Sequence, residues 1–166
     1  IPVVVDPVMV TSSGDKLLEE DAVQAYKDYL FPRASILTPN KKEAEWLCGK
    51  ELNEGNIEEC LKDLSRWGNS VIIKSVENRD FFIDYYYNPV EKVMKVYKKE
   101  GIRTRNVNGT GDSFASAIAT FLSKGYEIEF AVAEAERFIQ QSIELGARFK
   151  FGRGFGPVYP YYEVQE

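Results

Sequence analysis

Short apolar runs rich in β-branched residues alternate along this chain with longer amphipathic segments, and this alternation most restricts its fold. Each run has the length and composition of a strand buried on both faces. The runs lie at 1–5, 34–37 and 70–74. Helical periodicity predicts helices at 17–30, 41–47 and 57–67. Strands alternating with helices indicate an α/β fold with a mainly parallel sheet, and 166 residues suffice for a single domain over 1–166.

The second half of the chain changes pattern. Residues 81–87 and 92–97 predict a hairpin around Asn88-Pro89. A polar loop at 106–111 precedes helices predicted at 112–122 and 129–145. A tail rich in Gly and Pro closes the pattern at 152–160.

Composition excludes several classes of chemistry. Histidine is absent, so a general base must be a carboxylate, Lys, Tyr or Cys. The net charge of −5 gives no reason to expect nucleic acid or an anionic membrane. No apolar run approaches a membrane span and no signal peptide is visible, so we expect a cytoplasmic protein. Cys48 and Cys60 are expected to be buried reduced thiols, with a disulfide as the alternative.

Polar residues follow the predicted strands, where open α/β sheets bind ligands. They are Asp6, Thr38 with Asn40 and Glu43, and Lys74. Asp6 and Glu43 are either carboxylates that cap a helix or face water, or they bind Mg²⁺, directly or through water. Lys74 is either a surface lysine or a charge that neutralises ATP phosphates. Asn40 can also cap the helix that follows it.

The sequence Asn108-Gly109-Thr110-Gly111-Asp112 opens a predicted helix. Two glycines beside Thr110 let backbone amides converge, and with the helix dipole these amides form an anion site. Asp112 is either a helix N-cap or a base that takes a proton from an alcohol while the amides hold a phosphoryl group.

Five motifs in order resemble the hydroxymethylpyrimidine/phosphomethylpyrimidine kinases, a ribokinase-like family related to the pyridoxal kinases. The first runs from Asp6-Pro7-Val8-Met9-Val10 to Ser13-Gly14-Asp15-Lys16-Leu17-Leu18. The other four are Thr38-Pro39-Asn40-Lys41-Lys42-Glu43-Ala44-Glu45, Ile72-Ile73-Lys74, Thr104 to Gly111, and Gly152-Arg153-Gly154-Phe155-Gly156-Pro157-Val158.

The resemblance implies a ribokinase-like three-layer α/β/α fold and an ATP- and Mg²⁺-dependent kinase of a vitamin-precursor hydroxymethyl group. It places Asp112 at the base position and the amides of Gly109, Thr110, Gly111 and Asp112 in the anion hole. Lys74 would face the nucleotide phosphates, with Thr38 and Asn40 nearby, and Asp6 and Glu43 would act around the metal. The chain matches the C-terminal three-fifths of the family pattern, so the N-terminal portion is expected to be missing from it. A homodimer is also implied.

Two acceptors remain open. Pyrimidine kinases of this family usually carry Cys after Gly-Thr-Gly, and Asp112 favours pyridoxal or pyridoxine. The Ser13-Gly14-Asp15 segment and the Gly156-Pro157-Val158 tail favour hydroxymethylpyrimidine. The alternative to a kinase is a non-catalytic fragment or subunit that binds a nucleotide or a vitamin form.

Overall fold

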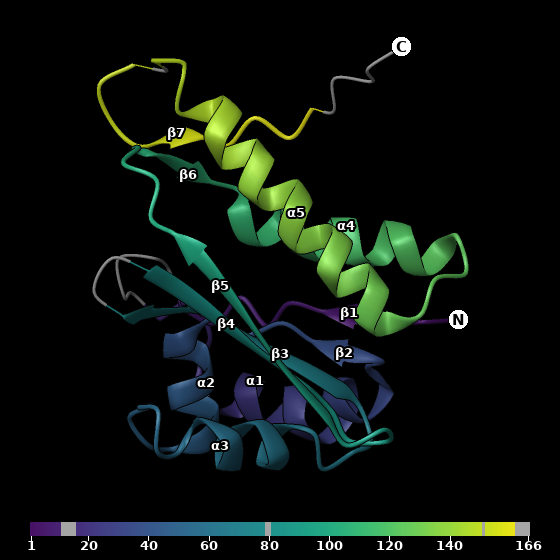
Figure 1. Ribbon diagram of the computed structural model, residues 1–166. Coiled ribbons are helices and arrows are strands. Elements are labelled where there is room, and N and C mark those ends of the chain that lie inside the picture. The colour runs from purple at the N-terminus through teal and green to yellow at the C-terminus, as the bar shows by residue number, and fades with distance from the viewer. Residues whose placement is uncertain (11–15, 79–80, 151, 162–166) are drawn as a thin grey trace. The chain divides into compact units, whose positions relative to one another are not determined.

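The computed structural model describes residues 1–10, 16–78, 81–150 and 152–161. The Ser13-Gly14-Asp15 motif therefore lies outside the described residues. The chain divides into two compact units, Ile1–Lys99 and Glu100–Glu166, which Figure 1 draws in purple to teal and in green to yellow. Each unit is described by itself.

The first unit is built on a five-stranded sheet in the order β1-β2-β3-β4-β5. The strands are β1 (Val4–Val5), β2 (Ile36–Leu37), β3 (Ser70–Asn78), β4 (Phe81–Asn88) and β5 (Val93–Glu100). β1, β2 and β3 run parallel, with Val5 opposite Leu37 and Leu37 opposite Val71. β4 runs antiparallel to β3. The predicted α/β class and parallel first three strands are confirmed, and the predicted hairpin forms the far side of the sheet.

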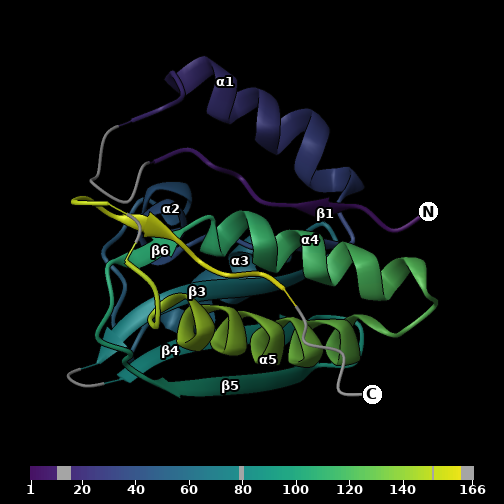
Figure 2. The same ribbon diagram turned by 90° about the horizontal axis from the view of Figure 1, so that it is seen from above.

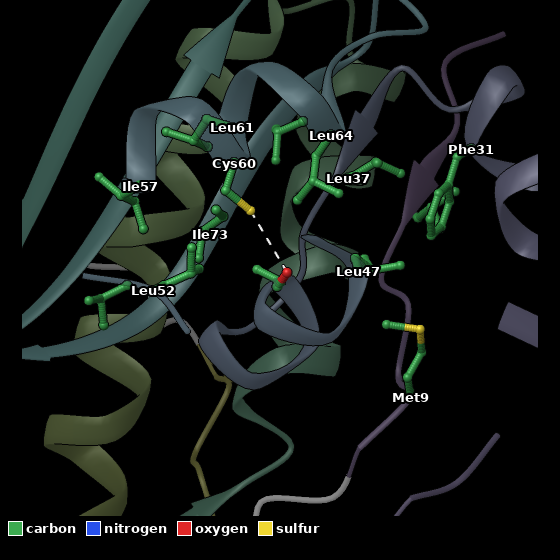
Figure 3. Packing of buried hydrophobic residues seen from close by; sticks show 14 of the residues in the cluster. Met9, Phe31, Leu37, Leu47, Leu52, Ile57, Cys60, Leu61, Leu64 and Ile73 are labelled. Carbon is green, nitrogen blue, oxygen red and sulfur yellow. Dashed lines mark hydrogen bonds between the residues drawn. The ribbon is translucent and has the colours of Figure 1, made fainter. Parts of the chain in front are cut away.

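Three helices pack on one face of this sheet (Figure 1). They are α1 (Glu20–Ala25), α2 (Lys41–Cys48) and α3 (Ile57–Leu64). Their apolar residues join those of the strands in one buried cluster, part of which Figure 3 shows. Phe31, Leu61 and Ile73 are among its fully buried members. Removing this apolar surface from water is the main stabilising contribution within the unit.

The segment predicted as one regular helix over 17–30 is less regular in the structure, so that prediction was wrong in detail. α1 gives way to a π-helix, η1 (Tyr26–Leu30), and then to a 3-10 turn, η2 (Phe31–Arg33). Pro32 has no N–H with which to continue an α-helix. The wider turn precedes Phe31, whose buried ring packs edge-on against Tyr26 and Trp67.

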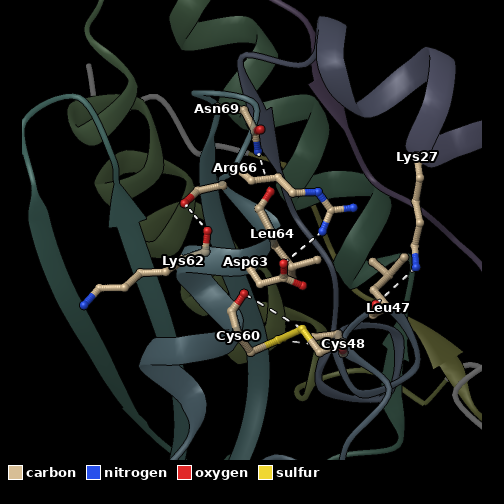
Figure 4. Close-up of polar contacts among 11 residues, drawn as sticks. Lys27, Leu47, Cys48, Cys60, Lys62, Asp63, Leu64, Arg66 and Asn69 are labelled. Atoms are coloured by element: carbon tan, nitrogen blue, oxygen red, sulfur yellow. Dashed lines mark hydrogen bonds and ion pairs between the residues drawn. A yellow bond between two sulfur atoms is a disulfide. The ribbon is translucent and has the colours of Figure 1, made fainter.

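The cysteines are the second correction. Cys48 and Cys60 form a disulfide rather than the expected pair of reduced thiols (Figure 4). Cys48 ends α2, and Cys60 lies on α3, which packs beside it. This packing brings the two Cα atoms to 6.0 Å, a separation that a disulfide spans.

The third strand also departs from prediction. It was expected to end at Lys74, but β3 continues to Asn78 and pairs with β4 along both parts. The pairing register shifts between Ile73 and Val76. Lys74 therefore lies within β3, next to an irregularity.

The second unit contains two helices and a two-stranded sheet. α4 (Thr110–Ser123) and α5 (Ile128–Gly146) pack side by side, as Figures 1 and 2 show. β6 (Asn106–Asn108) and β7 (Gly156–Pro157) run parallel, where the sequence predicted only a loop and a tail. A Cβ at Gly146 would lie 3.3 Å from the Tyr159 backbone N, so glycine permits this crossing of the chain.

Candidate active site

Asp6, Thr38 and Lys74 meet beyond the carboxyl ends of β1 and β2. Asp6 follows β1, Thr38 follows β2, and Lys74 lies on β3. One oxygen of the Asp6 carboxylate, Oδ1, accepts hydrogen bonds from Thr38 Oγ1 and from Lys74 Nζ, each at 2.9 Å. The Lys74 and Asp6 side chains are 11% and 16% exposed. A buried ammonium needs such a partner, so the pair is a defined charged site rather than two surface groups.

Asn40 and Glu43 form a capping box at the start of α2, as the sequence allowed for Asn40. Asn40 Oδ1 accepts the Glu43 N–H at 3.0 Å, and Glu43 Oε2 accepts the Asn40 N–H at 2.8 Å. This exchange satisfies helix-end donors that otherwise lack partners. Gly49, with φ 67°, ends the helix in the left-handed conformation, as its place after α2 predicted.

Glu43 also ties α2 to the segment after β1. Its second oxygen, Oε1, accepts the Met9 N–H at 3.0 Å, and the residue is 2% exposed. Burial raises the pKa of Glu43, and the backbone N–H groups of Asn40 and Met9 oppose that rise. The negative charge of Asp6 raises the pKa further, and the charge of Lys74 lowers it. Asp6, Glu43 and Lys74 thus form one electrostatic cluster.

In the second unit, β6 leads directly into the Gly109 loop. Gly109 adopts φ 81° at the N-cap of α4, a conformation that glycine adopts without strain. Thr110 Oγ1 donates to the Val107 carbonyl at 2.6 Å, which fixes the turn. The first amides of α4 have no partners within the helix. The glycine turn before a helix has the form that the sequence led us to expect, and anion binding at its amides stays a prediction.

Asp112 lies in the first turn of α4, and its side chain is exposed. No side chain caps this helix, because Gly109 occupies the N-cap. The N-cap interpretation of Asp112 is therefore wrong; as a first-turn acid its carboxylate interacts favourably with the helix dipole. The predicted site residues thus form one cluster in each unit.

Sequence reasoning missed two groups that support these clusters. Asn106, on β6, is 6% exposed and donates to the carbonyls of Gly146 and Phe149 at 2.7 and 2.8 Å. Asp84, on β4, is 3% exposed and accepts a hydrogen bond from the backbone N–H of Ser75, the residue after Lys74. The signal for Asp84 was present: it is a single charge between Phe81-Phe82-Ile83 and Tyr85-Tyr86-Tyr87. Nothing in the sequence around Asn106 indicated partners 40 residues away.

Comparison with known proteins finds relatives named as a pyrimidine kinase and as a thiamine biosynthesis protein. A hydroxymethylpyrimidine/phosphomethylpyrimidine kinase of Staphylococcus aureus is 34% identical over 164 residues, 95% of this chain and 58% of the relative. The thiamine biosynthesis bifunctional protein ThiED of Geobacter sulfurreducens is 37% identical over 163 residues, 94% of this chain and 32% of that protein. The chain thus spans less than two thirds of the length of these relatives.

Solved structures share the fold. The pyridoxal kinase of Staphylococcus aureus, in complex with AMP-PCP and pyridoxal, superposes with a TM-score of 0.84 at 28% identity, covering 99% of this chain and 60% of that one. The ADP complex of Bacillus subtilis pyridoxal kinase gives a TM-score of 0.75 at 31% identity, covering 86% and 54%. These likenesses confirm the expected ribokinase-like fold.

The sequence profile of one family matches residues 1–159, nearly the whole chain, under the description phosphomethylpyrimidine kinase. The match includes β1, the Asp6 cluster and the Gly109 loop. The chain belongs to the phosphomethylpyrimidine kinase family.

Proposed function

We propose that this chain forms the phosphate-handling and proton-abstracting part of an ATP-dependent kinase. Its acceptor would be the hydroxymethyl group of a vitamin precursor, either hydroxymethylpyrimidine and its phosphate or a pyridoxal-like ring. One observation carries the proposal: Asp112 follows the Gly109 loop in the first turn of α4, and its carboxylate is exposed. The relatives support it, since they are named as pyrimidine kinases and as a pyridoxal kinase bound to AMP-PCP.

The first step belongs to the second unit. The Asp112 carboxylate accepts the proton of the substrate hydroxyl as its oxygen attacks the γ-phosphorus. The amides of Gly109, Thr110, Gly111 and Asp112 donate to the equatorial oxygens of the transferring phosphoryl group. Such donors act where negative charge develops in the transition state.

The first unit supplies the charges for the nucleotide. Lys74 places an ammonium against the phosphates, and Thr38 and Asn40 lie beside it at the carboxyl ends of the strands. In the complex, the Lys74 ammonium, which contacts Asp6 in this structure, would also donate a charge-assisted hydrogen bond to a phosphate oxygen.

Magnesium fits this cluster with one or two carboxylate ligands at most, its other ligands being water and phosphate oxygens. In the described part of the chain, no three His, Cys, Asp or Glu side chains converge as a metal cage. Both Glu43 oxygens hold backbone amides, which leaves Asp6 as the better direct ligand. Mg²⁺ commonly takes one or two carboxylates and keeps its waters, so Asp6 and Glu43 would hold it with the phosphates. When bound, the ion neutralises charge on the phosphates.

The decisive experiment is Asp112→Asn in the whole protein. We expect turnover with ATP and either acceptor to fall about 10²–10⁴-fold, because a positioned general base contributes that much. The Kd for ATP should stay unchanged. Glu20→Gln, another exposed first-turn acid, is the matched control and should retain activity. A variant at Asp112 that turns over normally would refute the proposed base.

The same assay separates the acceptors, because kcat/KM is compared directly for hydroxymethylpyrimidine and pyridoxal.

We also propose that the whole protein works as a homodimer in the cytoplasm, as the family resemblance implies, and sedimentation velocity tests the dimer. Among the described residues, no helix is long and apolar enough to cross a membrane.

A further inference from the structure

A β-bulge lies beside Lys74. Ile73 pairs with Tyr85 and Val76 pairs with Ile83, so two residues of β3, Lys74 and Ser75, lie opposite the single residue Asp84. Ser75 has φ 60°, in the left-handed region that favours glycine. A serine persists there only where the surroundings compensate for the strain.

Asp84 supplies that compensation. Its Oδ1 accepts the Ser75 N–H at 2.7 Å, and its Oδ2 accepts Lys99 Nζ at 2.7 Å. The Asp84 side chain is 4% exposed. A carboxylate buried this deeply needs both a counter-charge and hydrogen bonds, and Lys99 and Ser75 provide them.

The bulge determines how Lys74 is presented. Side chains alternate between faces in a regular strand, and a bulge redirects the side chains at and beyond it. The Lys74 N–H donates to the Pro39 carbonyl at 2.9 Å, while its Nζ reaches Asp6. Lys74 is therefore held on one side by Pro39, in the segment after β2, and on the other by Ser75, whose N–H is bound to Asp84.

We infer that Asp84 is a positioning residue for Lys74: its carboxylate holds Ser75 in the left-handed conformation and so sets the ammonium toward the nucleotide phosphates. Lys99 holds that carboxylate in place through the ion pair at 2.7 Å. The inference rests on the proposed function of Lys74. It assigns a task to a buried charge that lies outside the Asp6, Glu43 and Lys74 cluster.

The test compares Asp84→Ala in the whole protein with the same change in a Ser75→Gly background. Glycine adopts positive φ without help, so it should replace what Asp84 supplies. We expect Asp84→Ala alone to lower kcat/KM for ATP about 10²-fold, the cost of a misplaced group. In the Ser75→Gly background we expect a loss below about tenfold, because the bulge no longer needs the carboxylate. Equal losses in both backgrounds, or no loss, would overturn the inference.

If Asp84→Ala fails to fold, a second variant, Asp84→Asn, still tests the inference. Asp84→Asn keeps an acceptor for the Ser75 N–H and removes only the charge. We expect its ATP Kd, measured by calorimetry, to stay within about threefold of the parent value, because the hydrogen bond rather than the charge sets the bulge. A Kd weakened as much as in Lys74→Ala would assign the effect to the charge and refute the inference.

Lys74→Ala separates the proposed role of Lys74 in ATP binding from the inferred positioning role of Asp84. If it weakens ATP binding about tenfold or more, as loss of a charged hydrogen bond should, the role of Lys74 stands and the Asp84 variants alone decide the inference. If Lys74→Ala leaves ATP binding unchanged, the proposed role of Lys74 fails and the positioning role of Asp84 fails with it.

Discussion

Asn106 should be among the most sensitive polar positions of the second unit. Its side-chain amide donates to two carbonyls at the end of α5, Gly146 O at 2.7 Å and Phe149 O at 2.8 Å. Asn106→Leu keeps the approximate shape but removes both donors. The buried Gly146 carbonyl then keeps only the Phe149 N–H at 3.1 Å, and the partly buried Phe149 carbonyl loses the Asn106 donor.

The magnitude follows from those two contacts. Losing one of two hydrogen bonds at the buried Gly146 carbonyl costs about 0.5–1.5 kcal/mol, and losing the Asn106 donor at the partly buried Phe149 carbonyl costs about 1–2 kcal/mol. The free energy of unfolding should therefore fall by about 1.5–3.5 kcal/mol. For a chain of this size, each kcal/mol lowers the midpoint by about 2–4 °C, which gives a decrease of roughly 3–14 °C.

Asn108 provides the matched comparison on the same strand. It makes one exposed bond, from Nδ2 to Phe155 O at 3.1 Å, so Asn108→Leu should cost about 0.5–1.5 kcal/mol. Both variants are followed by thermal and urea unfolding, monitored by circular dichroism. Equal losses at Asn106 and Asn108 would refute the reasoning, because burial would then not control the cost.

Two further predictions concern the first unit. Burial raises the pKa of Glu43 above its ordinary 4.5, so protonation favours the folded state. Its contribution to stability is fully present below the unfolded pKa and is lost as the pH rises through the folded pKa. The stability of the parent relative to Glu43→Gln should therefore decline from about pH 4 toward neutrality in urea titrations, and a rising difference would contradict this assignment. Reducing the Cys48–Cys60 disulfide, which joins residues 12 apart, should lower the free energy of unfolding by about 3 kcal/mol. A Cys48→Ala/Cys60→Ala variant should not respond to the reductant, and two free thiols in the untreated protein would contradict the disulfide.

Features with local signals were predictable from the sequence. Asn40 and Gly49 bracket α2 as expected, because a cap and a terminating glycine act within one turn of the helix. The meeting of Asp6, Thr38 and Lys74 followed from parallel strands, whose carboxyl ends share one edge of the sheet. The turn at Gly109 before α4 followed from its glycines and from the helix after it, whereas anion binding there stays a prediction.

Features that depend on distant partners were not predictable in this way. β6 and β7 are two or three residues long and pair across some 50 residues, so neither carries a strand signal of its own. The Cys48–Cys60 pairing depends on how α2 packs beside α3. The bulge at Ser75 depends on Asp84 of the neighbouring strand. In each case tertiary packing overrides the local pattern.

The shared oxygen of Asp6 restricts how this cluster can change over generations. Because Oδ1 serves both Thr38 and Lys74, replacing Asp6 removes two bonds at once, while replacing either donor leaves the other bond in place. Effects of substitutions within such a network do not add, and coupling of about 0.5–3 kcal/mol is usual between contacting residues. Asp6 and Lys74 are thus expected to change together, since a lineage that exchanges only one of them passes through a form in which this buried ion pair is broken.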